Sequence, residues 1–136
     1  MTVPASRRGK NRMEVFAKAN ELCSYTVEIT ANERTFKPEF AMLTARIVDA
    51  SVAIGQYLWS ANNIKVVDDD DLAERRSLQR KAKVKCNELI FLIGVAKKTF
   101  HLRGRRVHHW SGLVSSVRSM TSAWSESDAR RFRAGH

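Results

Sequence analysis

The sequence predicts an all-α protein, an antiparallel four-helix bundle, and three observations support this. Apolar residues recur at steps of three and four in four long segments, a spacing that places them on one face of a helix. Only six glycines and two prolines occur in 136 residues, so few positions suit the turns between short strands. Hydrophobic residues make up 43% and charged residues 28% of the chain, as in folded globular domains. A chain of this length is expected to form one domain with its own core.

The first helix is predicted over about residues 12–33, after a basic tail at 1–11. Residues 34–37 break its apolar pattern. Pro38 then suits the first turn of a second helix, because the N–H that proline lacks would have no partner there. The predicted apolar stripe of the first helix comprises Val15, Ala19, Leu22, Cys23, Thr26 and Ile29.

The second helix is predicted to end in the connection at 60–67, where Asn62 and Asn63 tolerate the left-handed backbone of a C-cap. Trp59, near this end, suits an intersubunit contact as well as a place in the core. The stripe of this helix comprises Phe40, Leu43, Ile47, Ala50, Ile54 and Leu58.

Four aspartates, residues 68–71, precede the third helix. The alternatives for this run are a metal site, a disordered segment or a helix cap. A cap is favoured, because an apolar stripe continues directly from the run and because aspartates at a helix start accept unbonded N–H groups. No glycine or glutamate follows at the positions that an EF-hand requires. The stripe comprises Leu72, Arg75, Gln79, Ala82, Cys86, Leu89, Ile93 and Phe100.

The fourth helix follows a turn at 101–106 with Gly104 as its pivot. The predicted four-helix bundle spans 12–125, and residues 126–136 are expected to form a basic C-terminal tail. The stripe of the fourth helix comprises Val107, Trp110, Val114, Val117, Met120 or Thr121, and Trp124.

The positive charge of the chain is concentrated in one third of the sequence. The net charge is +10, and residues 72–106 contain eleven basic and only two acidic residues. Such a local excess indicates a basic surface and a polyanionic partner, and favours nucleic acid bound through its phosphates. No motif for reading bases is present. The candidate nucleic-acid-binding residues are Arg75, Arg76, Arg80, Lys83, Arg103, Arg105 and Arg106.

Arg75 and Gln79 occupy the core-facing stripe of the third helix. Polar residues within an apolar stripe indicate that this half of the helix faces solvent or a subunit interface. We therefore expect a homo-oligomer in which a neighbouring subunit covers them.

Signatures of catalysis and targeting are absent from the sequence. It contains no phosphate-binding loop, dinucleotide-binding loop, zinc-protease motif or nucleophile elbow. His108 and His109 are adjacent, so their side chains diverge on a helix and cannot chelate one ion together. We expect a non-catalytic protein without a cofactor or metal. Cys23 and Cys86 are expected to be reduced, buried thiols, and with neither a secretory signal nor a membrane span the protein is expected to be soluble and cytoplasmic.

Four stretches of the chain resemble one family, the accessory variability determinant (Avd) proteins encoded beside reverse transcriptases in diversity-generating retroelements. The resemblance covers about residues 13–132. The stretches read KANELCSYTVEITANERTF, ANNIKV, ERRSLQRKA and RRVHHWSGLVSSVRSMTSAWSESDARRF.

The resemblance implies a homopentamer around a central channel, with the fold of the proteins encoded in 23S rRNA intervening sequences. It also implies a non-catalytic accessory role, in which the protein binds a reverse transcriptase and RNA or cDNA during mutagenic retrohoming. The intervening-sequence branch carries a proline in the second helix, and the region 50–55 has none, which favours the Avd branch. The alternatives are an intervening-sequence protein of that kind, and an oligomeric adaptor that binds an acidic protein.

Overall fold

The computed structural model describes the backbone of residues 5–134 and the side chains of residues 12–132. Four α-helices and one short 3-10 helix make up the fold, and the described residues contain no strand. The prediction of an all-α chain with four helices is therefore confirmed. The elements are α1 Ala5–Thr30, η1 Pro38–Phe40, α2 Ala41–Asn63, α3 Asp69–Thr99 and α4 Gly104–Ala134.

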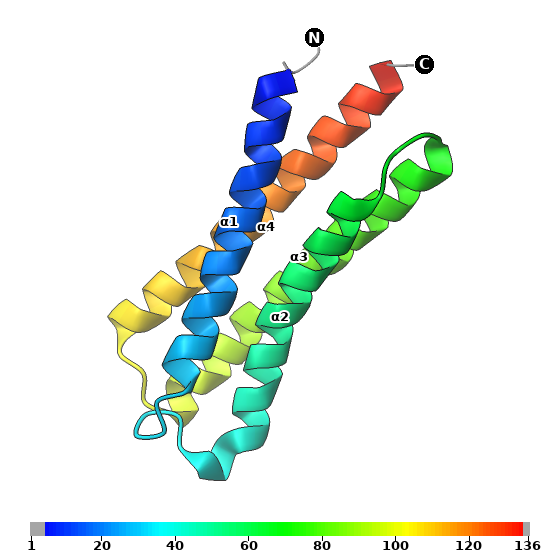
Figure 1. Ribbon diagram of the computed structural model, residues 1–136. Coiled ribbons are helices and arrows are strands. Elements are labelled where there is room, and N and C mark those ends of the chain that lie inside the picture. The colour runs from blue at the N-terminus through cyan, green and yellow to red at the C-terminus, as the bar shows by residue number, and fades with distance from the viewer. Residues whose placement is uncertain (1–4, 135–136) are drawn as a thin grey trace.

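The four helices form a closed ring. Each packs against the next helix in the sequence, and α4 packs back against α1. Because the connections are short, successive helices run in opposite directions (Figure 1). One end of the bundle holds the beginning of α1, the end of α4 and the α2–α3 connection. The opposite end holds the loop at 31–37 and the α3–α4 turn.

Most of the predicted stripes face the centre of the bundle. Ile47, Leu89 and Val114 are representative, with less than 1% of the surface exposed. The stripes fail at the loop end, where Phe40 is 42% exposed. Phe36, outside every predicted stripe, is buried instead. Its ring lies 4.7 Å from that of Phe100, because the loop at 31–37 folds over the end of the bundle.

The aspartate run is a helix cap. Asp68 is the N-cap of α3, and its Oδ1 accepts a hydrogen bond from the Asp71 N–H at 2.9 Å. The Asp71 carboxylate accepts in return from the N–H of Asp68 at 3.3 Å and of Val67 at 3.0 Å. This reciprocal arrangement is a capping box. The prediction for this stretch is confirmed.

The helix ends differ from the predicted boundaries. The helix expected from about residue 12 begins at Ala5, and the residues 126–134 expected in a tail continue α4. Residues 1–4 and 135–136 of the two expected tails lie outside the described residues. The stretch 127–129 is buried, so α4 stays packed against the bundle within the segment that the sequence assigned to a tail.

Two turns also differ from expectation. Asn62 and Asn63 remain in α2, and the C-cap residue Ile64 is extended. The left-handed residue in the α3–α4 turn is His101, with φ 53°, rather than Gly104. The Leu102 N–H bonds to the Lys97 carbonyl, the six-to-one bond of a Schellman ending, which requires a left-handed residue at this place.

The two cysteines form no disulfide. Cys86 is buried, as predicted, whereas Cys23 is only half-buried and lines a groove between α1 and α2. Within the described part of the chain, no helix is long and apolar enough to cross a membrane.

Candidate nucleic-acid interface

Arg75 lies inside the protein and not on a basic surface. Its Nη1 bonds to the Asp128 carboxylate at 3.2 Å, its Nε to the Ala61 carbonyl at 3.2 Å and its Nη2 to the Ile64 carbonyl at 2.6 Å. The side chain of Gln79 donates to the other Asp128 oxygen at 3.1 Å. We therefore remove Arg75 from the candidate surface.

The same network corrects the expectation that Arg75 and Gln79 need a neighbouring subunit. Arg75 is 6% exposed and Gln79 is fully buried within one chain. Their partner Asp128 is itself only 3% exposed. Because the positive charge meets a carboxylate and two carbonyls, its burial is compensated inside the protomer. These two residues give no reason for assembly.

Three of the predicted residues do share one surface, along the junction of α3 and α4. Arg76 and Arg80 are exposed and Lys83 is half-buried. Arg76 Nε donates to Ser125 Oγ on α4 at 3.3 Å, which places this side of α3 against α4. We call Arg76, Arg80, Lys83 and Arg118 the α3–α4 basic face.

Arg118 was missed by sequence reasoning. It comes from α4 and donates to the Asn87 side chain of α3 at 2.7 Å. Arg118 precedes Ser125 by seven residues and so lies on the same side of α4. This spacing indicates that Arg118 faces α3 only once Ser125 is known to contact Arg76. The acid next to Asn87 in the sequence, Glu88, is directed elsewhere. Glu88 pairs with Lys85 at 2.9 Å and lines the groove toward α2.

The remaining predicted residues, Arg103, Arg105 and Arg106, line a pocket of about 720 Å³ at the loop end of the bundle. The fold brings residues from α1, the loop at 31–37, the α3–α4 turn and the first turns of α4 to this pocket. We call it the basic pocket. Its lining comprises Tyr25, Arg34, Thr35, Phe100, His101, Leu102, Arg103, Arg105, Arg106 and His109.

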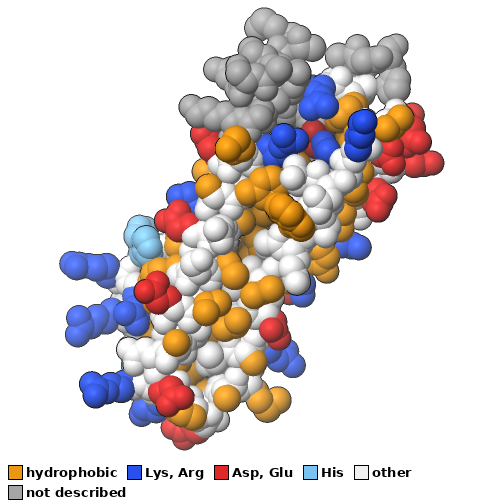
Figure 2. Space-filling model, viewed as in Figure 1, with side chains coloured by type: hydrophobic (Ala, Val, Ile, Leu, Met, Phe, Trp, Pro, Cys, Tyr) orange, Lys and Arg blue, Asp and Glu red, His pale blue; other side chains and the backbone are white. Residues whose placement is uncertain are grey.

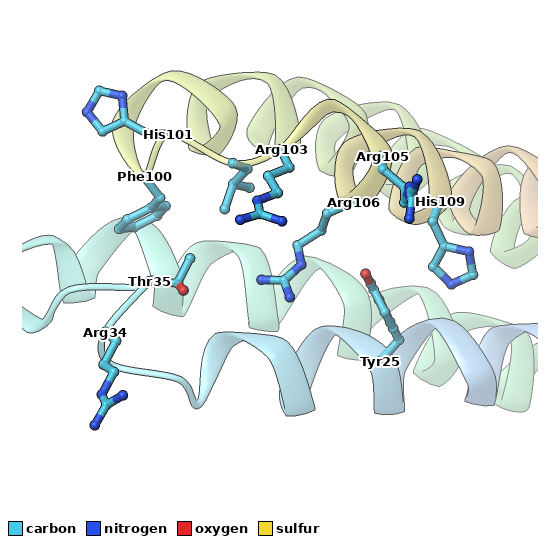
Figure 3. Close-up of a pocket in the computed structure, with 10 residues that line it drawn as sticks. Tyr25, Arg34, Thr35, Phe100, His101, Arg103, Arg105, Arg106 and His109 are labelled. Atoms are coloured by element: carbon cyan, nitrogen blue, oxygen red, sulfur yellow. The ribbon is translucent and has the colours of Figure 1, made fainter.

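Figure 3 shows how these side chains lie. The guanidinium groups of Arg103 and Arg106 point from the turn and from α4 into the space above α1. The Tyr25 hydroxyl points from α1 toward the same space. Arg34 and His101 point away from it, toward the rim.

The basic pocket is an uncompensated positive region. Its lining contains four arginines and no acid. Among the side chains described, ion pairs join Lys18 to Glu21, Arg75 to Asp128 and Lys85 to Glu88, and none involves an arginine of the pocket. Figure 2 shows Lys and Arg side chains gathered over this end of the molecule, where α4 begins. Arg103 and Arg106, which point into the space, are therefore placed to meet an anion.

The α3–α4 basic face and the basic pocket lie at different levels of the bundle. Arg76 and the pocket residue Phe100 are separated by most of α3, about 36 Å at 1.5 Å per residue. Arg118, opposite Asn87, lies between the two levels. The structure therefore extends the predicted clusters with one arginine between them and with Arg34, which only the folded loop brings to the pocket.

Within residues 12–132, no group of three or more His, Cys, Asp or Glu side chains is placed to hold a metal ion. Comparisons with models of protein families, with curated proteins and with solved structures find no match to this chain.

Proposed function

We propose that this protein is a non-catalytic nucleic-acid-binding protein that holds RNA or DNA through its phosphates. The observation that carries the proposal is the gathering of basic side chains in two clusters, the α3–α4 basic face and the basic pocket. The α3–α4 basic face contributes four basic side chains, and the basic pocket contributes four arginines with no acid in its lining. Such a surface attracts a phosphate backbone and releases its counterions.

The mode of binding that this surface supports is independent of base sequence. The basic side chains lie along the flank of two long helices and around a pocket, and no helix stands out from the bundle to enter a groove. Arginine forms paired hydrogen bonds to phosphate oxygens, whereas lysine supplies a point charge. Contacts to phosphate position a nucleic acid without reading its bases.

The finer proposal is that the protein serves as the accessory protein of a diversity-generating retroelement. In that role it binds a reverse transcriptase together with template RNA and cDNA in the cytoplasm, and supports mutagenic retrohoming. The motifs that resemble Avd proteins support this proposal, as does the all-helical fold with four helices.

We also propose assembly as a homopentamer. Its support in the structure is a groove of about 830 Å³ between α2 and α3. Two apolar side chains that line it, Val84 and Phe91, are 49% and 69% exposed, and Met42 on α2 is 81% exposed. Exposed apolar patches of this kind mark protein interfaces. The same observation favours the alternative of an adaptor that binds another protein.

The experiment that tests nucleic-acid binding measures RNA affinity as a function of salt. The variant Arg76→Gln/Arg80→Gln/Lys83→Gln removes three charges of the α3–α4 basic face. We expect the plot of log affinity against log salt concentration to become less steep, by about 0.7 to 0.9 in slope for each lost phosphate contact. The change should be equal for unrelated RNA sequences. Fluorescence anisotropy between about 50 and 200 mM salt covers the range in which such contacts change affinity.

A matched control has the same loss of charge elsewhere. Lys37, Lys65 and Lys81 are exposed and belong to neither basic cluster, so Lys37→Gln/Lys65→Gln/Lys81→Gln should keep most of the salt slope. Equal losses in both triple variants would mean that only net charge matters. An unchanged slope in the first variant would show that the α3–α4 basic face is merely solvated.

A further inference from the structure

We infer that the basic pocket is a binding site for a nucleoside phosphate, taken either as a free mononucleotide or as the terminal nucleotide of a strand. The site combines a converging pair of arginines, a tyrosine hydroxyl and an apolar floor within one cavity. This inference deepens the proposed function, on which it rests, by assigning a distinct ligand to one part of the basic surface.

The charges of the pocket fit a phosphate monoester. Arg103 and Arg106 approach the same space from different turns, and the Tyr25 hydroxyl faces them (Figure 3). A monoester carries a charge of about −1.5 to −2 at pH 7 and three acceptor oxygens, whereas an internal phosphodiester carries one charge. Two guanidinium groups with a hydroxyl donor match the monoester. The first turn of α4 begins beside the pocket and contains no acidic residue that would repel a phosphate.

The size and the floor of the pocket fit a nucleoside rather than phosphate alone. Its volume of about 720 Å³ lies in the range of cavities that enclose small organic ligands. Phe100 and Leu102 form an apolar floor, and each is 7% exposed. The Tyr25 ring stands 4.9 Å from the His109 ring, edge to face. Aromatic rings at such a site are suited to stacking with a base.

The floor is held rigidly, which favours a preformed site. The Phe100 ring contacts Phe36 at 4.7 Å and Phe40 at 5.9 Å between centroids. Tyr25 is packed in the same way against Trp110 at 6.3 Å. Since these rings are fixed by neighbours, ordering them costs little when a ligand binds.

The test is calorimetric titration of the full chain with AMP, adenosine and inorganic phosphate. We expect AMP to bind at least about tenfold more tightly than adenosine or inorganic phosphate, since only AMP offers both groups. Arg103→Gln/Arg106→Gln should weaken AMP by about tenfold or more. The control Arg76→Gln/Arg80→Gln removes the same charge from the α3–α4 basic face, and should change AMP affinity less than about twofold. Tyr25→Phe keeps the ring packing and should weaken AMP more than adenosine.

A second arm separates the two sources of the ligand. Short single-stranded RNAs of one sequence, with a 5′-phosphate or a 5′-hydroxyl, bind with different affinities if the pocket receives a strand end. If the ligand is a free mononucleotide, the RNAs with a 5′-phosphate and with a 5′-hydroxyl bind with equal affinity, and AMP still binds. The inference is overturned if AMP binds no better than adenosine, or if both arginine pairs reduce AMP affinity equally. If only this inference fails, long RNA still binds the wild type and still loses affinity in the α3–α4 triple variant. If the proposed function itself fails, the wild type binds no RNA at all.

Discussion

At the scale of single residues, the informative feature is the network of Arg75, Gln79 and Asp128. It ties the end of α2 to α3 and α4, because Arg75 reaches two carbonyls at that end and a carboxylate on α4. Only one polar atom of this network, Gln79 Oε1, lacks a hydrogen-bond partner in the structure. A buried charge with such partners is tolerated, but it becomes costly once its counterion is removed.

Asp128→Asn should therefore destabilise the fold strongly. The substitution keeps the shape of the side chain but leaves the Arg75 guanidinium buried without a counterion. We expect a loss of about 3 kcal/mol in the free energy of unfolding, at the lower end for a broken buried pair because two carbonyl bonds remain. Urea denaturation at neutral pH measures this loss. The control Glu126→Gln, at an exposed position, should stay within about 0.5 kcal/mol; similar values for both would show that the buried pair is not held as described.

Cys86 gives a dependence of stability on pH. Burial raises the pKa of its thiol to about 12 from an ordinary 9.0, although the Arg118 charge acts in the opposite direction. The unfolded chain therefore loses this proton first as pH rises. The stabilisation from the neutral buried thiol is complete below about pH 9, and it is lost as pH rises from about 9 toward 12.

We predict that the stability difference between the wild type and Cys86→Ala shrinks between about pH 8 and pH 10.5. Urea denaturation at the two pH values measures it, and the comparison with the variant cancels other groups that titrate there. Cys23→Ala provides the matched control at the half-buried cysteine. The assignment fails if the Cys86→Ala difference is constant over this range.

At the scale of elements, the capping box decides where α3 begins. The four aspartates are not equivalent, since Asp68 and Asp71 exchange hydrogen bonds with each other's backbone. Asp70 is exposed in the first turn, where its charge meets the helix dipole alone.

Asp68→Ala should cost about 1 kcal/mol of stability, because the Asp71 N–H loses its acceptor. Asp70→Ala removes the same charge and should cost only a few tenths of a kcal/mol, since alanine also favours the helix. Thermal unfolding of both variants makes the comparison. Equal losses of stability in the two variants would indicate that the charge of aspartate, and not its hydrogen bond, stabilises the start of α3.

Local pattern was sufficient for the four helices and for the cap of α3, because helical spacing and capping are properties of neighbouring residues. It was insufficient where partners are distant. Asp128 appeared to belong to a polar tail, yet it is the counterion of Arg75, 53 residues away. Arg118 and Arg34 joined the basic clusters for the same reason, as helix packing and a folded loop brought them there. Single-helix periodicity carries no information on such pairings.

At the scale of the whole molecule, different parts of the surface differ in their side-chain chemistry. The groove between α2 and α3 carries exposed apolar side chains, whereas the α3–α4 basic face carries charge. The two surfaces adjoin at Asn87, which lines the groove and accepts a hydrogen bond from Arg118 of the α3–α4 basic face.

Phe91→Glu should dissociate the proposed pentamer, because it replaces the most exposed apolar side chain that lines the groove with a charge that assembly would bury. Light scattering of the wild type should give about five times the 15.5 kDa of one chain, and of the variant a smaller mass. Val27→Glu changes an exposed apolar residue of α1 and should leave the mass unchanged. A wild-type mass of 15.5 kDa at micromolar concentration would exclude the pentamer.

The antiparallel order of the helices gives the molecule two chemically different ends. α4 begins beside the basic pocket and runs 31 residues to the end where α1 starts, a span of about 46 Å. A dye attached to the far end of α4 would sit at a fixed distance from anything docked in the pocket. Energy transfer to a second dye on one end of an oligonucleotide changes steeply with distance. The bundle can therefore act as a molecular ruler that reports the direction in which a bound strand runs.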